Sequence, residues 1–96
     1  MIEALEELRQ FVIANELPRT DLALFGVRCP YCGKSDRIRK LEAPDDLKTY
    51  IQAQDWIVYQ NLWENVRQPG GWPGVCRFCQ NILHLTDSGQ AVAIGE

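Results

Sequence analysis

Long apolar stretches are missing from this 96-residue sequence. The longest apolar run, residues 22–27, is far shorter than the roughly 20 residues that a membrane-spanning helix needs. The residues after Met1 also lack the basic start, apolar centre and small-residue cleavage site of a secretory signal peptide. The sequence therefore predicts a protein of the cytoplasm or another reducing intracellular setting, without membrane association.

An excess of positive charge is also missing. Ten basic and 13 acidic side chains give a formal net charge of -3, whereas proteins that bind nucleic acid through charge alone are usually basic. Half of the basic side chains nevertheless lie within a short stretch, namely Arg28, Lys34, Arg37, Arg39 and Lys40. We favour the interpretation that these residues form a solvated strand face, and the alternative is a patch that binds phosphate or carboxylate groups.

Histidine occurs once, and recognisable catalytic motifs do not occur. The sequence has no grouping of Ser, His and Asp that suggests a catalytic triad, and no Gly-rich loop between a strand and a helix to bind phosphates. The carboxylates are scattered along the expected helices, as solvated side chains are. We therefore expect a protein that is not an enzyme and has no small-molecule substrate.

Cysteine occurs four times, as two Cys-x-x-Cys pairs and nowhere else. Cys29 and Cys32 form the first pair, and Cys76 and Cys79 form the second pair after a gap of 43 residues. In a reducing compartment such pairs are more often metal ligands or catalytic groups than structural disulfides. Two pairs can bring four thiolates to one point, which is the donor set of a closed tetrahedral zinc site. The sequence thus predicts one structural Zn²⁺ on these four cysteines.

This spacing, with a hairpin expected after the second pair, resembles the zinc-ribbon class, in which two Cys-x-x-Cys turns, called knuckles, hold one ion. The resemblance covers residues 27–43 and 74–95, and it makes residues 44–73 a long insertion between the knuckles. The second knuckle departs from the usual pattern because Gln80 replaces a glycine. The class is shared by proteins of many functions, so the resemblance implies a metal-stabilised ribbon and no particular activity.

Three alternatives compete with a structural zinc site. The Cys-Pro-Tyr-Cys sequence alone is similar to the active-site motif of glutaredoxins, which would make Cys29 and Cys32 a thiol redox pair. The two knuckles also resemble those of rubredoxin, where four thiolates hold iron and pass one electron. His84 lies five residues after Cys79 and could replace one ligand, although we favour an ordinary strand residue. We prefer zinc, because a redox pair leaves the second knuckle unexplained and the long gap departs from the compact rubredoxin form.

The N-terminal region has the pattern of an amphipathic helix. Residues 2–15 contain no Gly or Pro, and their apolar side chains recur three and four positions apart. We therefore expect an N-terminal helix and a lead-in segment over residues 1–26, followed by the zinc ribbon over residues 27–96.

Alternating side chains predict the strands of the ribbon. The expected strands cover residues 37–41, 81–86 and 90–94. A three-residue connection ending in Gly89 joins the last two and suits a hairpin. The predicted fold class is therefore α+β, with a β-hairpin core, an N-terminal helix and a helical insertion.

Within the insertion, residues 45–67 also lack Gly and Pro. A loop is expected after this stretch, over residues 69–74. If residues 45–67 form one helix, that helix is apolar on two nearly opposite sides. One arc carries Leu47, Ile51, Val58 and Leu62, and the other carries Trp56, Tyr59 and Trp63. The competing interpretation is a buried strand over residues 55–62, where Trp, Ile, Val and Tyr have high strand propensity. We prefer the helix.

The aromatic side chains of the insertion lead to a functional hypothesis. Trp and Tyr are enriched at the centres of protein interfaces. The candidates for partner binding are Trp56, Tyr59, Trp63 and Trp72, and the alternative is that they fill the core of the chain itself. We expect a non-catalytic structural or adaptor subunit, with protein partners in a larger assembly or in a homo-oligomer.

Nucleic-acid binding is the second hypothesis. The basic stretch from Arg28 to Lys40 would contact phosphates, and Tyr31 or Phe78 at the knuckle tips would stack on bases. The acidic net charge argues against an independent nucleic-acid-binding protein. It agrees better with a ribbon inside the transcription or translation machinery, where partners supply most of the positive charge.

Overall fold

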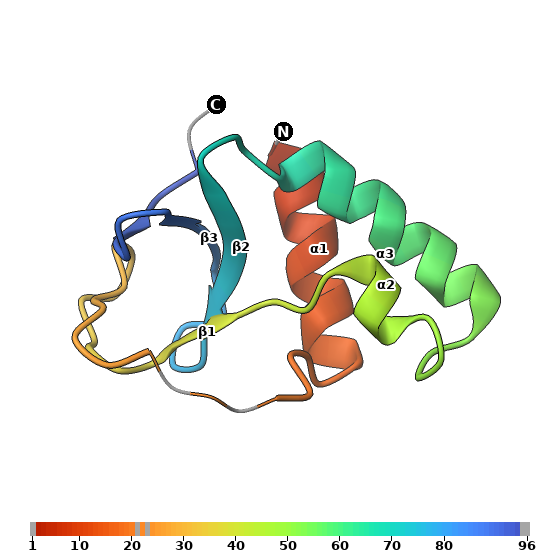
Figure 1. Cartoon of the computed structure of the whole chain (residues 1–96), viewed down its shortest axis with the longest axis horizontal. Coiled ribbons are helices and arrows are strands. Elements are labelled where there is room, and N and C mark those ends of the chain that lie inside the picture. Colours follow the sequence, from red (N-terminus) through yellow and green to blue (C-terminus); the bar gives the residue numbers. More distant parts are fainter. Residues whose placement is uncertain (1, 21, 23, 95–96) are drawn as a thin grey trace.

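The structure, a computed structural model, describes residues 2–20, 22 and 24–94. Its elements, in chain order, are α1 (Ile2–Ala14), β1 (Ile38–Lys40), α2 (Pro44–Leu47), α3 (Ala53–Val66), β2 (Gly71–Cys76), β3 (Ile82–Thr86) and β4 (Ala91–Val92) (Figure 1). The α+β class and the N-terminal helix are therefore confirmed. Position 23 of the apolar run and position 95 of the ribbon lie outside the described residues. Within them, no helix combines the length and the apolar character of a bilayer span.

The four strands form one antiparallel sheet in the order β1-β2-β3-β4. The strands expected over residues 37–41, 81–86 and 90–94 are confirmed in position by β1, β3 and β4, although β1 and β4 are shorter than expected. The hairpin between β3 and β4 turns at Gly89, whose φ of 88° is accessible to glycine because it has no Cβ. The first knuckle precedes β1 and the second connects β2 to β3, so the register of the sheet fixes one knuckle relative to the other.

The loop expected over residues 69–74 is wrong, because most of this segment belongs to strand β2. Gly and Pro usually argue against a central strand. The Leu41 N–H, just beyond the end of β1, donates a hydrogen bond to the Pro73 carbonyl oxygen (3.1 Å). Because the nitrogen and the carbonyl oxygen of a strand residue face the same side, the Pro73 nitrogen also faces this side, at a point that β1 does not reach. At Gly71, an added Cβ would collide with the backbone and a side chain of β3. Glycine, which is typical of loops, here allows β2 and β3 to approach each other closely.

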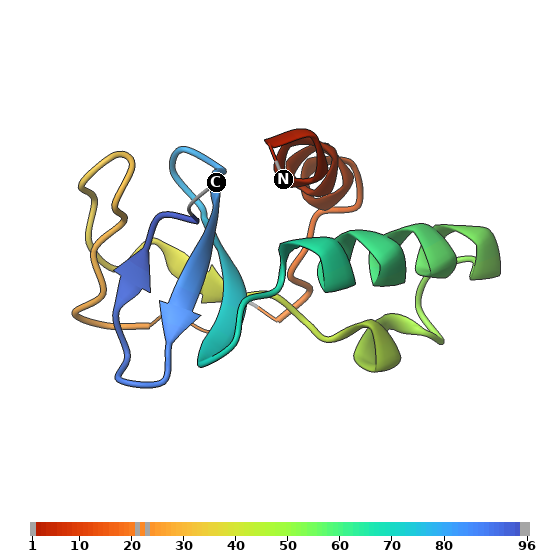
Figure 2. The ribbon, with the colours of Figure 1, turned by 90° about the horizontal axis from the view of Figure 1, so that it is seen from above.

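The segment 45–67 is helical, as we preferred, but it is not one continuous helix. Helix α2 ends at Leu47 and α3 begins only at Ala53. The interruption allows α2 to pack alongside α3 (Figure 2). There the Trp56 indole N–H donates a hydrogen bond to the Pro44 carbonyl oxygen at 2.6 Å. The break thus gives the half-buried Trp56 indole N–H a backbone acceptor in α2.

This break changes which side chains are buried. The buried face of α3 consists of Tyr59, Leu62, Trp63 and Val66, which follow the i, i+3, i+4, i+7 spacing of one helical stripe. Val58, expected on the same apolar arc as the buried Leu62, is 46% exposed. The expected arc was wrong because it placed Leu47 of α2 and Val58 of α3 on one face of a single continuous helix, whereas they belong to two separate helices.

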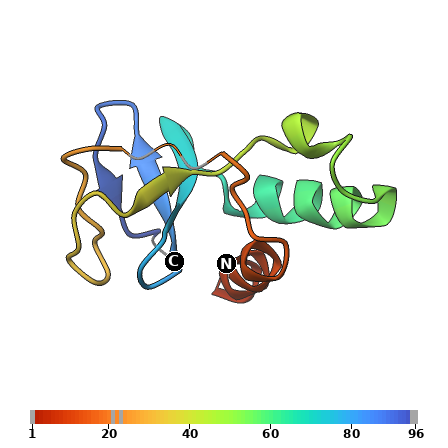
Figure 3. The same cartoon turned by 90° about the horizontal axis from the view of Figure 1, so that it is seen from below.

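The main hydrophobic core lies between α1, α3 and one face of the sheet (Figure 2). Its buried members include Leu8, Val12, Leu62, Val75 and Ile82. A second, smaller cluster on the ribbon contains Ile38, Leu83 and Leu85 together with Cys29 and Cys76. The sheet and knuckles lie at one end of the molecule and α2 and α3 at the other (Figure 3).

Four aromatic rings connect the helices to the sheet. Phe11 of α1 stacks on Tyr59 of α3 at a centroid distance of 5.4 Å, and Tyr59 lies 5.9 Å from Trp63. Trp63 meets Trp72 of β2 edge-on at 5.3 Å. The Trp72 indole N–H donates to the Leu41 carbonyl oxygen at 2.6 Å. Tyr59 and Trp63 are buried, so these two candidates for partner binding lie in the core of the chain itself.

We predict that Tyr59→Phe lowers the free energy of unfolding of the metal-loaded protein by about 1–2 kcal/mol. The Tyr59 hydroxyl donates to the Glu42 carbonyl oxygen at 2.6 Å, and burial raises the pKa of Tyr59, so the hydroxyl keeps the proton that it donates. Tyr50→Phe is the matched control, because Tyr50 is exposed. A urea titration followed by circular dichroism measures both losses, and equal losses would contradict the prediction.

Candidate metal centre

The four cysteine sulfurs lie together between the two knuckles. All lie within 4.8 Å of one another. The Sγ atoms of Cys29 and Cys79 are 3.7 Å apart, and those of Cys32 and Cys76 are 3.6 Å apart, so each short distance joins the two knuckles. Cys29 and Cys76 are buried, and Cys32 and Cys79 are half-buried. The structure thus brings the four expected ligands to one point, as in a zinc-ribbon-like site.

The spacing of the sulfurs fits one tetrahedral metal ion. Thiolates about 2.3 Å from a central ion lie about 3.8 Å from one another at tetrahedral angles. The two separations of 3.7 and 3.6 Å are close to this value. They are far longer than the S–S bond of about 2.05 Å in a disulfide, so the cysteines are free thiols. The site is therefore suited to a single ion, and both zinc and iron accept four thiolates.

The two knuckles have the same backbone geometry. In each, the N–H of the fifth residue donates to the carbonyl of the first cysteine, from Gly33 to Cys29 at 3.0 Å and from Gln80 to Cys76 at 2.7 Å. The N–H of the first cysteine donates in turn to the carbonyl of the sixth residue, at 3.0 and 3.2 Å. Gly33 and Gln80 are both left-handed, with φ of 79° and 63°. Gln80 therefore adopts the turn that glycine usually provides, at some conformational cost.

Burial opposes ionisation of the innermost thiols. It raises the pKa of Cys29 to about 12 and also raises the pKa of Cys76. Burial acts on Cys79 as well, but hydrogen bonds from the Asn81 backbone and side chain and from neighbouring thiols lower the pKa of Cys79 to about 7. A divalent cation among the sulfurs favours the thiolate form of all four, because its charge offsets their mutual repulsion.

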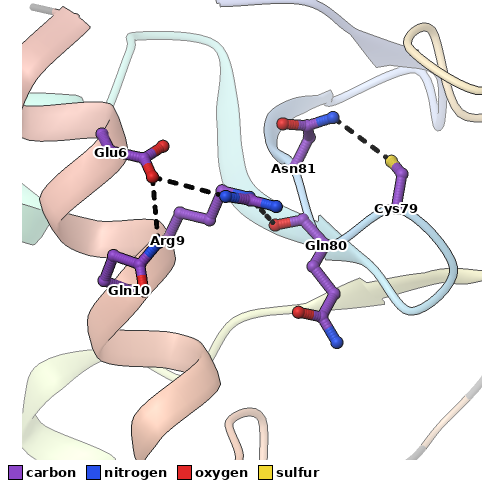
Figure 4. A network of polar contacts seen from close by, with 6 residues as sticks. All are labelled: Glu6, Arg9, Gln10, Cys79, Gln80 and Asn81. Atoms are coloured by element: carbon purple, nitrogen blue, oxygen red, sulfur yellow. Dashed lines mark hydrogen bonds and ion pairs between the residues drawn. The ribbon is translucent and has the colours of Figure 1, made fainter.

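Polar contacts around the cluster hold the second knuckle in place (Figure 4). The Asn81 side-chain amide donates to Cys79 Sγ at 3.4 Å. Arg9 Nε donates to the Gln80 carbonyl oxygen at 3.2 Å, and Arg9 also pairs with Glu6 at 3.3 Å. Helix α1 is thereby tied to the turn that carries two of the ligands.

Arg77 provides a second set of links from the same knuckle. Its guanidinium donates to the carbonyl oxygens of Leu17 and Pro18, at 3.2 and 2.9 Å. Its backbone N–H donates to the carbonyl oxygen of Arg37, the residue before β1, at 2.7 Å, which joins the second knuckle to the segment that follows the first. The side-chain links of Arg9 and Arg77 to these carbonyls join residues 59 to 71 positions apart, so no local sequence pattern could have identified them.

His84 is not part of the sulfur cluster. It is buried in β3, where its register partners are Pro73 of β2 and Val92 of β4. Among the described residues, the four cysteines are the only group positioned to hold a metal ion. The environment of His84 agrees with the favoured interpretation of an ordinary strand residue.

The five basic residues considered for phosphate binding occupy different environments. Arg28, Lys34 and Arg37 are exposed and lie next to the first knuckle. Arg39 is half-buried and donates to backbone carbonyls at 3.1 and 3.2 Å. The Lys40 ammonium lies 4.2 Å from the centroid of an indole ring of β2. Among the described residues, Arg28 and Arg37 therefore present their charge to solvent without an intramolecular contact of the guanidinium, whereas the Lys34 ammonium lies 5.0 Å from the centroid of the Phe78 ring.

We predict that Cys76→Ser abolishes metal binding and unfolds the ribbon. Cys76 is fully buried and faces Cys32, and metal binding at such a site supplies on the order of 10 kcal/mol of folding free energy. Elemental analysis should show loss of the ion, and circular dichroism should show loss of native structure. His84→Gln is the control and should keep the ion. A native, metal-loaded Cys76→Ser variant would overturn the assignment.

A second prediction concerns the amide next to the cluster. Asn81→Ala should weaken metal affinity about tenfold, because groups that hydrogen-bond to a ligand orient it and stabilise its charge. Asn65→Ala removes an exposed amide from α3 and should leave the affinity unchanged. Competition with a chelator of known affinity measures both variants. Equal affinities would show that the 3.4 Å contact does not support the site.

Comparisons with known proteins add no relative to this description. No family model matches the chain, and neither a curated protein nor a solved structure matches it. The metal centre is therefore identified from the four cysteines and their geometry alone.

Proposed function

We propose that this protein is a non-catalytic structural or adaptor subunit of a larger assembly, stabilised by one structural Zn²⁺ on Cys29, Cys32, Cys76 and Cys79. The observation that carries the proposal is the closed cluster of four sulfurs. Structural zinc sites are saturated by four protein ligands, whereas catalytic ones keep a position for water or substrate. An ion on these four thiolates has no open coordination position for water or substrate, so its role is to hold the two knuckles together.

The backbone around the first knuckle also argues against thiol redox chemistry. Reactive Cys-x-x-Cys thiols of the glutaredoxin type lie at the N-terminus of a helix, which lowers the thiol pKa. Here Arg28 and Ser35 form an isolated antiparallel bridge around the knuckle, and the next element is strand β1. Burial raises the pKa of Cys29, the first thiol of this pair. The first knuckle therefore lacks the helix N-terminus of a reactive Cys-x-x-Cys pair, and this favours a structural zinc site.

Exposed apolar side chains supply a candidate surface for a protein partner. Phe25 and Leu22 are 82% and 71% exposed, the largest values among the large apolar side chains of the described residues. Phe25 lines a groove of about 540 Å³ together with Trp72 and Leu85. Leu22 lines an adjoining groove that shares Trp72. Exposed apolar patches of this kind are typical of interaction sites.

The test is native mass spectrometry of the protein isolated under mild conditions from its own cells. We expect one zinc mass per chain and the additional mass of a bound protein. The double variant Leu22→Ser/Phe25→Ser should keep the zinc and lose the bound protein, because it removes apolar surface that a partner would bury. The control Ile57→Ser/Val58→Ser alters two exposed side chains of α3 and should keep both masses.

Two results would contradict this function. An iron mass, or a chain mass lowered by disulfide formation, would favour electron transfer or thiol chemistry. A zinc-loaded chain that carries no other protein in any variant would reject the adaptor role and leave the structural metal site in place.

A further inference from the structure

Charge is divided between the ribbon and the helical segments of the molecule. The ribbon segments, residues 24–43 and 71–94, contain six basic and three acidic side chains. The remaining described segments, residues 2–20 and 44–70, contain four basic and eight acidic side chains. Four thiolates around a divalent ion contribute about -2 at the ribbon end, so that end still has a small positive balance. The net charge of -3 thus conceals a ribbon with a positive balance and helical segments with a negative one.

Three cations of the ribbon end have no acidic partner among the described residues. Arg28, Lys34 and Arg37 are exposed and take part in no ion pair there. By contrast, Arg9 and Arg67 pair with glutamates one helical turn away, at 3.3 and 3.7 Å. The charges next to the first knuckle are therefore available to an anionic ligand.

Two aromatic rings occupy the same position of the two knuckles. Tyr31 precedes Cys32 and Phe78 precedes Cys79, and the two rings are 43% and 60% exposed. The Lys34 ammonium lies 5.0 Å from the centroid of the Phe78 ring, so a cation of the first knuckle adjoins an aromatic face of the second. Both knuckle loops project toward the same side of the sheet (Figure 3). The two knuckles therefore place aromatic rings and cationic side chains next to one another on one side of the sheet.

We propose that this surface, the knuckle face formed by Arg28, Tyr31, Lys34, Arg37 and Phe78, binds single-stranded nucleic acid. The three cations contact backbone phosphates, and the two rings stack on bases. Aromatic platforms beside positive charges are the chemistry by which proteins hold unpaired strands without reading their sequence. The site goes beyond the structural role proposed above: it requires the folded metal centre but no protein assembly.

The same features favour an unpaired strand over a duplex. Bases in a duplex are stacked on one another, so the exposed rings of Tyr31 and Phe78 could not reach their faces. Duplex readers generally insert a helix or a two-stranded ribbon into the major groove. Here the exposed cations and rings lie on and beside two short turns. An unpaired strand can bend around these turns and place both phosphates and bases against the protein.

The test is fluorescence anisotropy of a labelled twelve-nucleotide oligothymidine with the metal-loaded protein, repeated over a salt series. Three phosphate contacts to a single strand predict a slope of about -2 in a plot of log affinity against log salt, which is roughly a 20-fold loss between 50 and 200 mM. Phe78→Ala should weaken binding about tenfold, and Phe78→Trp should retain it, because stacking needs only an aromatic face. Arg28→Ala/Arg37→Ala should reduce the slope by about 1.4.

Matched controls use the helical segments. Tyr50→Ala removes a ring that is 59% exposed, and Lys48→Ala/Arg67→Ala removes two positive charges from exposed positions. Both should leave the affinity within about twofold, apart from a weak long-range charge effect. Metal content and circular dichroism of every variant establish that the fold is retained.

Three results would overturn the proposal. The first is the absence of binding at low salt up to about 100 µM protein, the weak limit of nonspecific binding. The second is an affinity that Phe78→Ala and Tyr50→Ala change equally. The third is equal binding of duplex DNA or polyglutamate, which would identify a general anion-binding surface or one for an acidic protein.

Discussion

The meeting of four thiol groups is the constraint on which the rest of the structure depends. It joins two turns that are separated by 43 residues of chain, and the sulfur-to-sulfur contacts cross from one turn to the other. A 96-residue chain buries a limited fraction of its surface, so an ion that holds both turns contributes as much as a large part of the core. Arg9 and Arg77 extend this constraint to the N-terminal helix and the segment after it.

The sequence predicts what depends on local pattern. The four ligands follow from their spacing, α1 from its periodicity, and β3 and β4 from alternation around Gly89. Strand β2 was missed because the reasons for Gly71 and Pro73 lie in neighbouring strands. The exposure of Val58 was missed because a break between two helices resets the phase of the apolar stripe. The links of Arg9 and Arg77 to distant carbonyls are tertiary contacts with no local signal at all.

In the ribbon, the metal ligands and the exposed aromatic rings have different roles. The sulfurs lie inside, where four-fold ligation leaves an ion inert. The aromatic rings between the ligands, Tyr31 and Phe78, are exposed at the surface. Tyr59 and Trp63 of the insertion are instead buried, and they complete a row of contacting rings between α1 and β2. Aromatic content alone therefore does not locate a binding surface, and burial decides between the two roles.

The pairing of β1 with β2 has a consequence for how this chain can vary. The insertion lies within the segment that runs from Lys40, at the end of β1, to its register partner Gly74 in β2. The sheet thus holds the two ends of this segment about one strand spacing apart. Lengthening a loop between fixed ends costs little extra closure entropy. The ribbon can therefore accept insertions of very different size at this point while the ligand geometry stays the same, and only the shared core with α1 limits what the insertion can be.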